Sequence, residues 1–321
     1  MSPRDDEEVP KQSASADPSA LAALLAEKSR LLDLILDQMA QGLMLVNADH
    51  VVEVCNRRAL ELLDLPPELM ARKPTFIEVL EHQWATDEFA KTPEEIKAFL
   101  RGGGILDQPP IYERQRPNGL IIEIQSVSMA DGGVLRTYTD ITERKRAEEQ
   151  IRYRARHDGL TSLINRDTFI EILSAKLNEC AIVGSRFAVH YMDLDRFKPV
   201  NDSLGHAVGD RVLAYVAERI RHAVREGDIV ARMGGDEFAM LQPDIDSIEQ
   251  TIGLGRRVVH SLDAPMDIDG HSISIGLSAG VAIFPAHGVT PEALMRNADR
   301  ALYDVKCTGG HGVRLFEMSG A

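Results

Sequence analysis

The stretch RMGGDEFAM, residues 232–240, places two glycines and two acidic residues between short apolar runs. The flanking runs DIVA and FAML are strand-like, and a Gly-Gly pair between such runs predicts a tight β-hairpin. Two interpretations of Asp236 and Glu237 are open at this point. They are solvated turn residues, or the turn projects them at a cation or a reacting oxygen. Taken alone, the stretch favours the first interpretation, because hairpin turns are far commoner than active sites.

A second acidic cluster lies in MDLDRFKPVNDSLGHAVGD, residues 192–210, at the end of a predicted strand. Asp193 and Asp195 flank Leu194 there, and we interpret Asp195 as a helix cap. Hard divalent cations take carboxylate and backbone carbonyl oxygens as ligands. If the hairpin lies beside this strand, Asp193 and Asp236 can hold Mg²⁺ between them. Such an arrangement is a minimal cradle for nucleoside triphosphate chemistry.

Composition narrows the class of protein. The chain has 321 residues, of which 44% are hydrophobic and 27% charged, so we expect two globular domains. The formal net charge of −14 disfavours a general nucleic-acid or membrane partner, since both need a basic surface. Three scattered cysteines form no metal or disulfide pattern, and no signal segment or apolar run of roughly 18 residues occurs. We therefore expect a soluble, cytoplasmic protein.

The first half of the chain divides into four segments. Residues 1–17 are polar, and we expect them to be disordered. Residues 18–40 predict a helix with a one-sided apolar face that suits a partner helix. Residues 41–142 give two short strands, several helices and a three-stranded meander. Residues 143–157 predict a connecting helix, with a short parallel coiled coil and a solvated single helix about equally favoured.

Residues 158–321 alternate strands and helices, which predicts a sheet covered by helices on one side. This segment resembles a GGDEF-type diguanylate cyclase domain in four motifs: DGLTSLINRDTF, DLDRFKPVNDSLGHAVGD, RMGGDEF and ADRALYDVK. Residues 41–142 resemble a PAS sensor domain in the order of their elements and in the closing DIT. The resemblance implies a two-domain α+β protein, in which a helix joins the PAS domain to a nucleotidyl-cyclase-like domain with a ferredoxin-like palm.

Domains of this family condense two GTP into cyclic di-GMP and release two pyrophosphates. The resemblance implies that Asp193, Asp236 and the Leu194 carbonyl bind Mg²⁺, or Mn²⁺ in its place. It implies that Asp236 or Glu237 assists deprotonation of the attacking 3′-OH. Lys198 matches a position where a point charge stabilises phosphoryl oxygens in the transition state.

The nucleotide contacts also follow from the resemblance. Asn201 and Asp210 would read guanine, and a carboxylate suits the N1–H and N2–H₂ donors that adenine lacks. His206 either lines that pocket or serves packing. Gly234 and Gly235 let the backbone approach the ribose and phosphates closely.

One departure from the family concerns the triphosphate. The family usually has an arginine four residues after the lysine that matches Lys306, whereas KCTGGHG places Gly310 there. Lys306 keeps its expected phosphate contact, but a second contact is put in doubt. GTP binding could therefore be weaker, and His311 is a candidate substitute.

A second ligand site is implied by REGD, residues 225–228, which matches the family's RxxD inhibitory site. There Arg225 and Asp228 would bind cyclic di-GMP as product and feedback ligand, and Arg257 or its neighbour Arg256 would complete the site. Without the family context, a helix-end arginine and a capping aspartate would be the preferred interpretation.

The ligand of the PAS domain stays unknown. The cysteine-bearing helix motif of blue-light flavin domains is absent, so we reject flavin as the ligand. His82 is the one attractive haem ligand, although such histidines are more often structural.

We expect a homodimer, because a symmetric product needs two facing GTP molecules. The leading hypothesis is a PAS-regulated diguanylate cyclase. The alternative is a catalytically weak domain that only binds cyclic di-GMP, and Asp210 disfavours a related cyclase for ATP.

Overall fold

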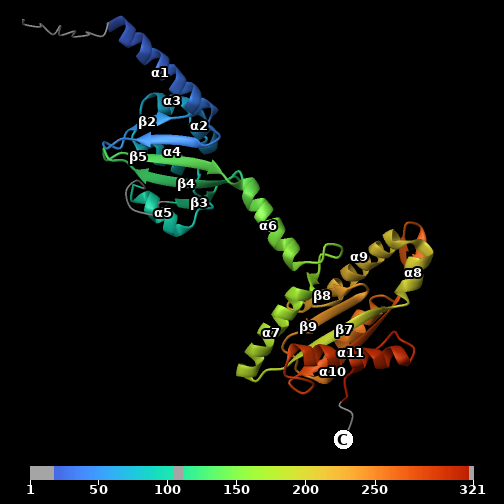
Figure 1. Ribbon diagram of the computed structural model, residues 1–321. Helices are drawn as coiled ribbons and strands as arrows, with labels where there is room; N and C mark the ends of the chain where they lie inside the picture. The colour runs from blue at the N-terminus through green and yellow to red at the C-terminus, as the bar shows by residue number, and fades with distance from the viewer. Residues whose placement is uncertain (1–17, 104–110, 318–321) are drawn as a thin grey trace, which may run out of the picture. The chain divides into compact units, whose positions relative to one another are not determined.

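The computed structural model describes residues 18–103 and 111–317 (Figure 1). The chain divides into two compact units, Met1–Glu148 and Glu149–Ala321. The disorder predicted for residues 1–17 concerns residues outside the described part of the chain. Among the described residues, no helix combines the length and the apolar character that a membrane crossing requires.

The first unit contains a five-stranded antiparallel sheet in the order β2-β1-β5-β4-β3. Its strands are β1 Gly42–Val46, β2 Val52–Cys55, β3 Ile111–Gln115, β4 Ile121–Ser128 and β5 Val134–Asp140. Its short helices are α2 Arg57–Leu63, α3 Pro67–Ala71, α4 Phe76–Ala85 and α5 Glu94–Arg101. Thr75 and Glu78 form a capping box that starts α4. Two strands, several helices and a three-stranded meander are the order that the sequence predicted.

Two helices in this part of the chain expose apolar side chains. Helix α1 Pro18–Gln38 was predicted over residues 18–40, and α6 Thr142–Arg156 over residues 143–157. Ile151 and Tyr153 of α6 are 68% and 51% exposed. The apolar residues of α1 are each about half exposed: Leu21, Leu24, Leu25, Leu31, Leu32, Leu34 and Ile35. Both helices therefore keep apolar surface that the described chain leaves uncovered.

The second unit contains a six-stranded sheet in the order β13-β12-β7-β9-β8-β6. Its strands are β6 Ile164–Asn165, β7 Phe187–Asp195, β8 Ile229–Gly234, β9 Glu237–Gln242, β12 Gly276–Phe284 and β13 Val313–Leu315. The pairs β7–β9, β8–β9 and β7–β12 are antiparallel, whereas β6–β8 and β12–β13 are parallel. A separate hairpin joins β10 Met266–Ile268 to β11 His271–Ile273.

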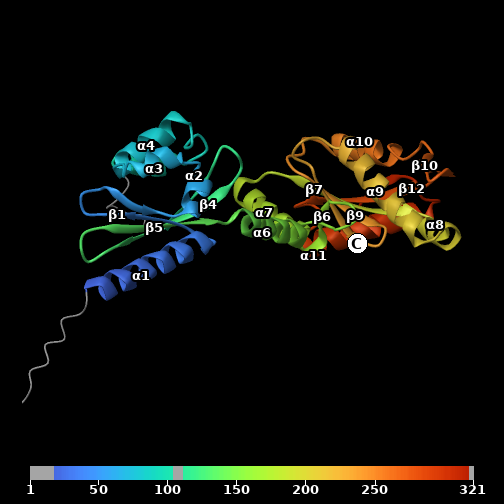
Figure 2. The same ribbon diagram turned by 90° about the horizontal axis from the view of Figure 1, so that it is seen from above.

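Helices cover both faces of this sheet, so the prediction of helices on one side was wrong. The helices are α7 Arg166–Val183, α8 Phe197–Leu204, α9 His206–Ala223, α10 Ile248–His260 and α11 Pro291–Cys307. Helices α9 and α10 share one core with the sheet, and α7 and α11 share the other (Figure 2). The physical reason is visible in β12, in which eight consecutive residues are buried. A strand buried on both faces is a continuous apolar run rather than an alternating one.

Candidate active site

The hairpin that carries the two adjacent acids lies beside the acidic end of β7. Asp193 pairs with Glu237 in the β7–β9 ladder, and the Leu194 N–H donates to the Asp236 carbonyl at 3.3 Å. The turn that joins β8 to β9 uses Gly234 and Gly235, whose φ angles of 138° and 53° suit glycine. The structure thus brings together the two acidic clusters that the sequence placed 43 residues apart, at Asp193 and Asp236.

The turn is held by a residue that the sequence reasoning missed. Arg232 donates from Nε and Nη2 to the Gly235 carbonyl, at 3.0 and 2.8 Å. Its Nη1 donates to both carboxylate oxygens of Asp158, at 3.1 and 3.2 Å. Burial alone would raise the pKa of Asp158, but hydrogen bonds from Thr161 and Arg232 outweigh it and lower that pKa. The motifs that contain Asp158 and Arg232 were recognised separately, and nothing in their sequence reveals the link.

Negative charge gathers around Asp193, whose side chain is 16% exposed. Lys306 Nζ lies 2.5 Å from Asp193 Oδ1. Burial raises the pKa of the Asp193 carboxyl, the Lys306 ammonium lowers it, and the carboxylates of Asp236 and Glu237 raise it further. One ammonium thus faces three carboxylates. Oxygen donors with excess negative charge fit a hard divalent cation such as Mg²⁺.

Tyr191 adds a hydrogen bond on the same side of β7. Its hydroxyl donates to Glu237 Oε2 at 3.2 Å. Burial, followed by the charge of Glu237, raises the pKa of the Tyr191 hydroxyl, so this group stays a donor. The two residues line a pocket of about 340 Å³ with Arg166 and Arg296. The position of Glu237 is therefore fixed by a neutral phenol rather than by a cation.

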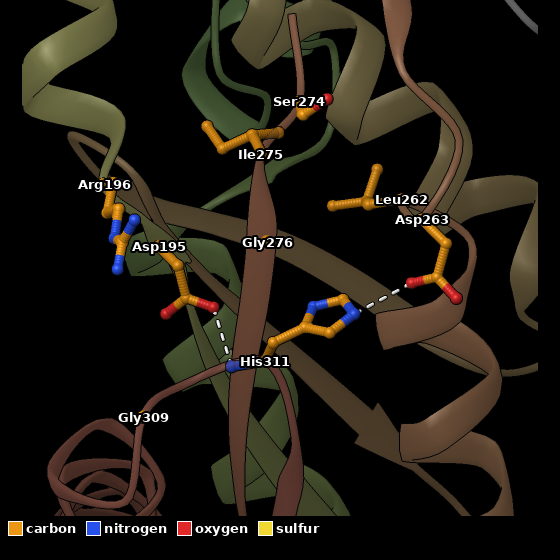
Figure 3. A pocket seen from close by; sticks show the side chains of 9 residues that line it. All are labelled: Asp195, Arg196, Leu262, Asp263, Ser274, Ile275, Gly276, Gly309 and His311. Carbon is orange, nitrogen blue, oxygen red and sulfur yellow. Dashed lines mark hydrogen bonds and ion pairs between the residues drawn. The ribbon is translucent and has the colours of Figure 1, made fainter.

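Asp195 does not cap a helix, so that prediction was wrong. Its Oδ1 accepts from Ser278 Oγ at 2.7 Å, and its Oδ2 accepts from the His311 N–H at 2.9 Å. The residue at the start of α8 is Arg196, and it makes no side-chain cap. Asp195 instead ties β12 and the loop after α11 to the end of β7 (Figure 3).

The same loop explains the departure at Gly310. Gly310 has a φ of 77°, and a Cβ at this position would lie 3.0 Å from Asp195 Oδ1. An arginine there would be strained and crowded. The imidazole of His311, the candidate substitute, lies against Asp263, with Nε2 2.9 Å from Asp263 Oδ1.

The residues predicted to contact the nucleotide lie on α8 and α9, next to the end of β7. Lys198 and Asn201 are on α8, and His206 and Asp210 are on the first turns of α9; all but the half-buried Asn201 are exposed. A Cβ added to Gly209 would fall 1.8 Å from Asn201 Oδ1. Gly209 is therefore a second residue that the sequence reasoning missed, because its missing side chain makes room for the Asn201 carboxamide.

The RxxD segment forms a closed turn. The Arg225 N–H donates to Asp228 Oδ2 at 3.0 Å, and Arg225 Nη2 donates to the Pro243 carbonyl at 3.0 Å. The Asp228 side chain is 0% exposed, whereas that of Arg225 is 47% exposed. Arg257 Nε donates to the Ala223 carbonyl at 2.6 Å, which places Arg257 beside this turn. Arg257 is therefore bonded to the chain two residues before Arg225, while the Asp228 carboxylate serves the turn itself.

The interior of the first unit holds a different charge cluster. Arg116 binds Glu88 through two parallel hydrogen bonds, Nε to Oε2 at 2.6 Å and Nη2 to Oε1 at 2.5 Å. Arg116 Nη1 donates to the Leu62 carbonyl at 2.8 Å. The two side chains are 3% and 9% exposed. His82, the candidate haem ligand, lies half-buried in the last turn of α4.

Comparisons with known proteins agree with this geometry. A family model described as "Diguanylate cyclase, GGDEF domain" matches residues 155–311, and a PAS fold model matches residues 36–149. An uncharacterized signaling protein of Caulobacter vibrioides is 35% identical over 285 residues, which cover 86% of this chain and 34% of that protein. Diguanylate cyclase TpbB of Pseudomonas aeruginosa is 37% identical over 210 residues, 65% of this chain and 48% of that protein. The chain thus spans at most about half the length of these relatives.

A solved structure gives the same result for the second unit. It contains the coiled coil and GGDEF domain of DgcB from Caulobacter crescentus in complex with c-di-GMP. Its TM-score is 0.50 at 31% identity, over 54% of this chain and 92% of that one. The fold and the two family models define a PAS domain followed by a nucleotidyl-cyclase-like domain. The chain belongs to the GGDEF diguanylate cyclase family, as its motifs predicted.

Proposed function

We propose that this protein is a diguanylate cyclase that condenses two GTP into cyclic di-GMP and releases two pyrophosphates. The observation that carries the proposal is the pairing of Asp193 with the Asp236–Glu237 turn beside Lys306. We assign residues 158–321 to the cyclase domain, 143–157 to the linker helix, 41–142 to the PAS domain and 18–40 to the N-terminal helix. GTP as substrate would place the cyclase domain in the cytoplasm.

In this proposal, Asp193, Asp236 and the Leu194 carbonyl hold Mg²⁺ or Mn²⁺. The cation, when bound, would neutralise charge that develops on the phosphates. Asp236 or Glu237 takes the proton of the 3′-OH while the hydroxyl oxygen forms a bond to the α-phosphorus and pyrophosphate leaves. Lys198 and Lys306 stabilise the phosphate oxygens.

Guanine recognition would use the α8–α9 corner. The Asn201 carboxamide would donate to and accept from the guanine edge, the Asp210 carboxylate would accept from N1–H and N2–H₂, and His206 would close the side of the pocket. Gly234 and Gly235 leave the backbone of the turn open to the ribose and phosphates. The selection of guanine over adenine then follows from the Asp210 carboxylate, since adenine offers no donors at N1 and position 2.

Catalysis would require a homodimer, because each cyclase domain holds one GTP and the product joins two. The apolar side chains that α1 and α6 expose support this part of the proposal, since such surface favours association. Specific activity should therefore fall on dilution into the monomeric range. The PAS domain would then act by dimerising or by sensing, and its ligand is not assigned.

Product inhibition would act through Arg225, Asp228 and Arg257. The exposed Arg225 side chain supports stacking on guanine, whereas Asp228 would have to leave its turn to accept from the base. Arg225→Ala should weaken inhibition by added cyclic di-GMP and largely preserve initial rates. Identical inhibition curves for the two proteins would remove Arg225 from this role.

The direct test is to incubate the full chain with GTP and Mg²⁺ and identify the products by mass spectrometry. Cyclic di-GMP and pyrophosphate are the expected products. The alternative function, a catalytically weak domain that binds cyclic di-GMP, would give binding without turnover. Gly310 in place of the family's arginine is the observation that favours this alternative.

A further inference from the structure

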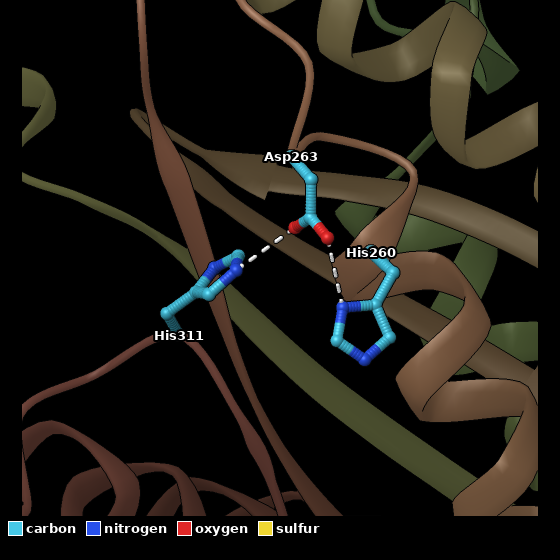
Figure 4. A group of neighbouring side chains, drawn as sticks. All are labelled: His260, Asp263 and His311. Atoms are coloured by element: carbon cyan, nitrogen blue, oxygen red, sulfur yellow. Dashed lines mark hydrogen bonds and ion pairs between the residues drawn. The ribbon is translucent and has the colours of Figure 1, made fainter.

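A second cluster of potential metal ligands lies apart from the acidic turn. It consists of His260, Asp263 and His311 (Figure 4). His260 is the last residue of α10, Asp263 lies in the turn that follows, and His311 lies in the loop after α11. The Asp263 carboxylate sits between the two imidazoles, with Oδ2 3.0 Å from His260 Nδ1 and Oδ1 2.9 Å from His311 Nε2.

The spacing of these atoms fits a small coordination sphere. One potential ligand atom from each of the three residues lies within 4.8 Å of the others. Ligand bonds of about 2.0–2.2 Å in a tetrahedral zinc site separate the ligand atoms by roughly 3.3–3.6 Å. Contacts of 2.9 and 3.0 Å between the carboxylate and the imidazoles are close to that separation. Small side-chain movements therefore suffice to admit a metal ion.

The backbone arranges the cluster in advance. The Asp263 N–H donates to the His260 carbonyl at 3.2 Å, which fixes the spacing of these two residues. The His311 N–H donates to Asp195 Oδ2 at 2.9 Å and to Ser278 Oγ at 3.0 Å. His311 also has a φ of 53°, in the left-handed region that favours glycine. Ligands that are already ordered lose less entropy when a metal binds.

We propose that His260, Asp263 and His311 form a binding site for a divalent transition metal of the Zn²⁺ class. Two imidazole nitrogens and one carboxylate suit Zn²⁺, whereas Mg²⁺ and Ca²⁺ take oxygen ligands. Each neutral imidazole binds through the nitrogen that faces Asp263, and its proton moves to the other ring nitrogen. The site is thus chemically distinct from the oxygen-only cluster at Asp193 and Asp236.

Three protein ligands leave a fourth position for water or an anionic oxygen. Asp263 and His311 line a pocket of about 390 Å³ together with Asp195 and Arg196 (Figure 3). In that view His311 lies between Asp195 and Asp263. A bound metal would join the end of α10 to the loop that follows Lys306. The site would therefore stiffen the loop that Asp195 holds, and it does so whether or not the protein makes cyclic di-GMP.

The test uses the full chain, without an affinity tag that contains histidine, in excess Mg²⁺ to occupy the oxygen-only cluster. Zn²⁺ is titrated by calorimetry, and Co²⁺ is added separately because its visible absorption reports tetrahedral nitrogen ligation. The variants are His260→Gln and His311→Gln. The matched control is His271→Gln, which changes an exposed histidine of β11 in the same unit. Circular dichroism checks that each variant is folded.

We expect one Zn²⁺ per chain in the wild-type protein and in His271→Gln. Each ligand variant should lose at least about tenfold in Zn²⁺ affinity, together with the visible Co²⁺ band. Zn²⁺ should also raise the thermal midpoint of the wild-type second unit and leave that of the ligand variants unchanged. Equal Zn²⁺ affinity in all four proteins, or no binding by the wild type, would overturn the proposal.

Discussion

Two groups of charged side chains, the buried Arg116–Glu88 pair of the first unit and the partly exposed acidic cluster of the second, differ in how their charges balance. In the first unit, the Arg116 guanidinium meets the Glu88 carboxylate in a two-pronged pair with one added carbonyl. In the second unit, the Lys306 ammonium faces Asp193, with Asp236 and Glu237 close enough to raise the pKa of Asp193. Within the Arg116–Glu88 pair, each charged group has its partner. A cluster with excess acid suits a bound cation, as the proposed Mg²⁺ site requires.

The largest effect should follow from changing the acidic cluster. Asp236→Asn removes a charged metal ligand and a proton acceptor, so we expect cyclase activity to fall by at least about a thousandfold. Initial rates of cyclic di-GMP formation measure this loss. Because the side chain keeps its size, the thermal midpoint should change little. Near-normal turnover would show that the Asp236 carboxylate is not required for catalysis.

A change to the Arg116–Glu88 pair should lower the stability of the first unit instead. Glu88→Ala leaves the Arg116 guanidinium buried without its carboxylate, which should lower the free energy of unfolding of the first unit by about 3–5 kcal/mol. Trp84 is the chain's one tryptophan, so its fluorescence in a urea titration reports on this unit.

The control for that measurement is Glu61→Ala, which removes the exposed ion pairs of Glu61 with Arg57 and Arg58. Exposed pairs of this kind contribute little to stability. Equal destabilisation by both variants would mean that burial of the Arg116–Glu88 pair does not matter.

Another ionisable group, the buried His190, remains neutral. Burial lowers its pKa from 6.5 to about 4, and its Nε2 lies 3.1 Å from Gln242 Oε1. Above about pH 6.5 the folded and unfolded chains both carry a neutral imidazole, so the full stability is present. As the pH falls from there towards 4, the His190 imidazole binds a proton in the unfolded chain but not in the folded chain. His190 should thus cost up to about 3 kcal/mol of stability across this window.

Urea titrations between pH 7.5 and 4.5 would measure this slope. His190→Leu should flatten it, whatever its effect on stability at neutral pH. His271→Leu changes an exposed histidine and should leave the slope as it is in the wild type. An unchanged slope in His190→Leu would assign the acid sensitivity to other groups.

The smallest effect concerns an uncharged side chain next to the acidic cluster. Gly209→Ala places a methyl group where Asn201 Oδ1 now lies, so the carboxamide has to turn away. We expect the KM for GTP to rise by about tenfold, which corresponds to about 1.4 kcal/mol. Gly253→Ala on α10 is the control, because its Cβ would meet nothing within 4 Å. If both variants keep the wild-type KM, Asn201 does not contact the nucleotide.

The sequence predicted what depends on local pattern and ordered motifs. The hairpin beside β7 and the helices at residues 18–40 and 143–157 are found within two residues of their expected ends. The ion pair between Arg232 and Asp158 could not be predicted from the sequence, because the two residues are 74 positions apart and either charge alone is an ordinary surface feature. Gly209 was missed for a similar reason, since its role is to leave space for the Asn201 side chain.

The second layer of helices was missed for a different reason. A short apolar run fits a strand buried on both faces as well as one buried on a single face, and the periodicity of the sequence does not separate them. The cap assigned to Asp195 failed because its partners, Ser278 and His311, come from distant strands and loops. Both errors concern contacts between elements, which a local pattern does not encode.

The crowding at Gly310 has a consequence for redesign. An arginine placed at this position would meet the Asp195 carboxylate and a left-handed backbone, so that single substitution should not supply the family's phosphate contact. Asp195 and the neighbouring loop would have to change as well. The effect of any substitution at position 310 is therefore epistatic, because it depends on the residue at position 195.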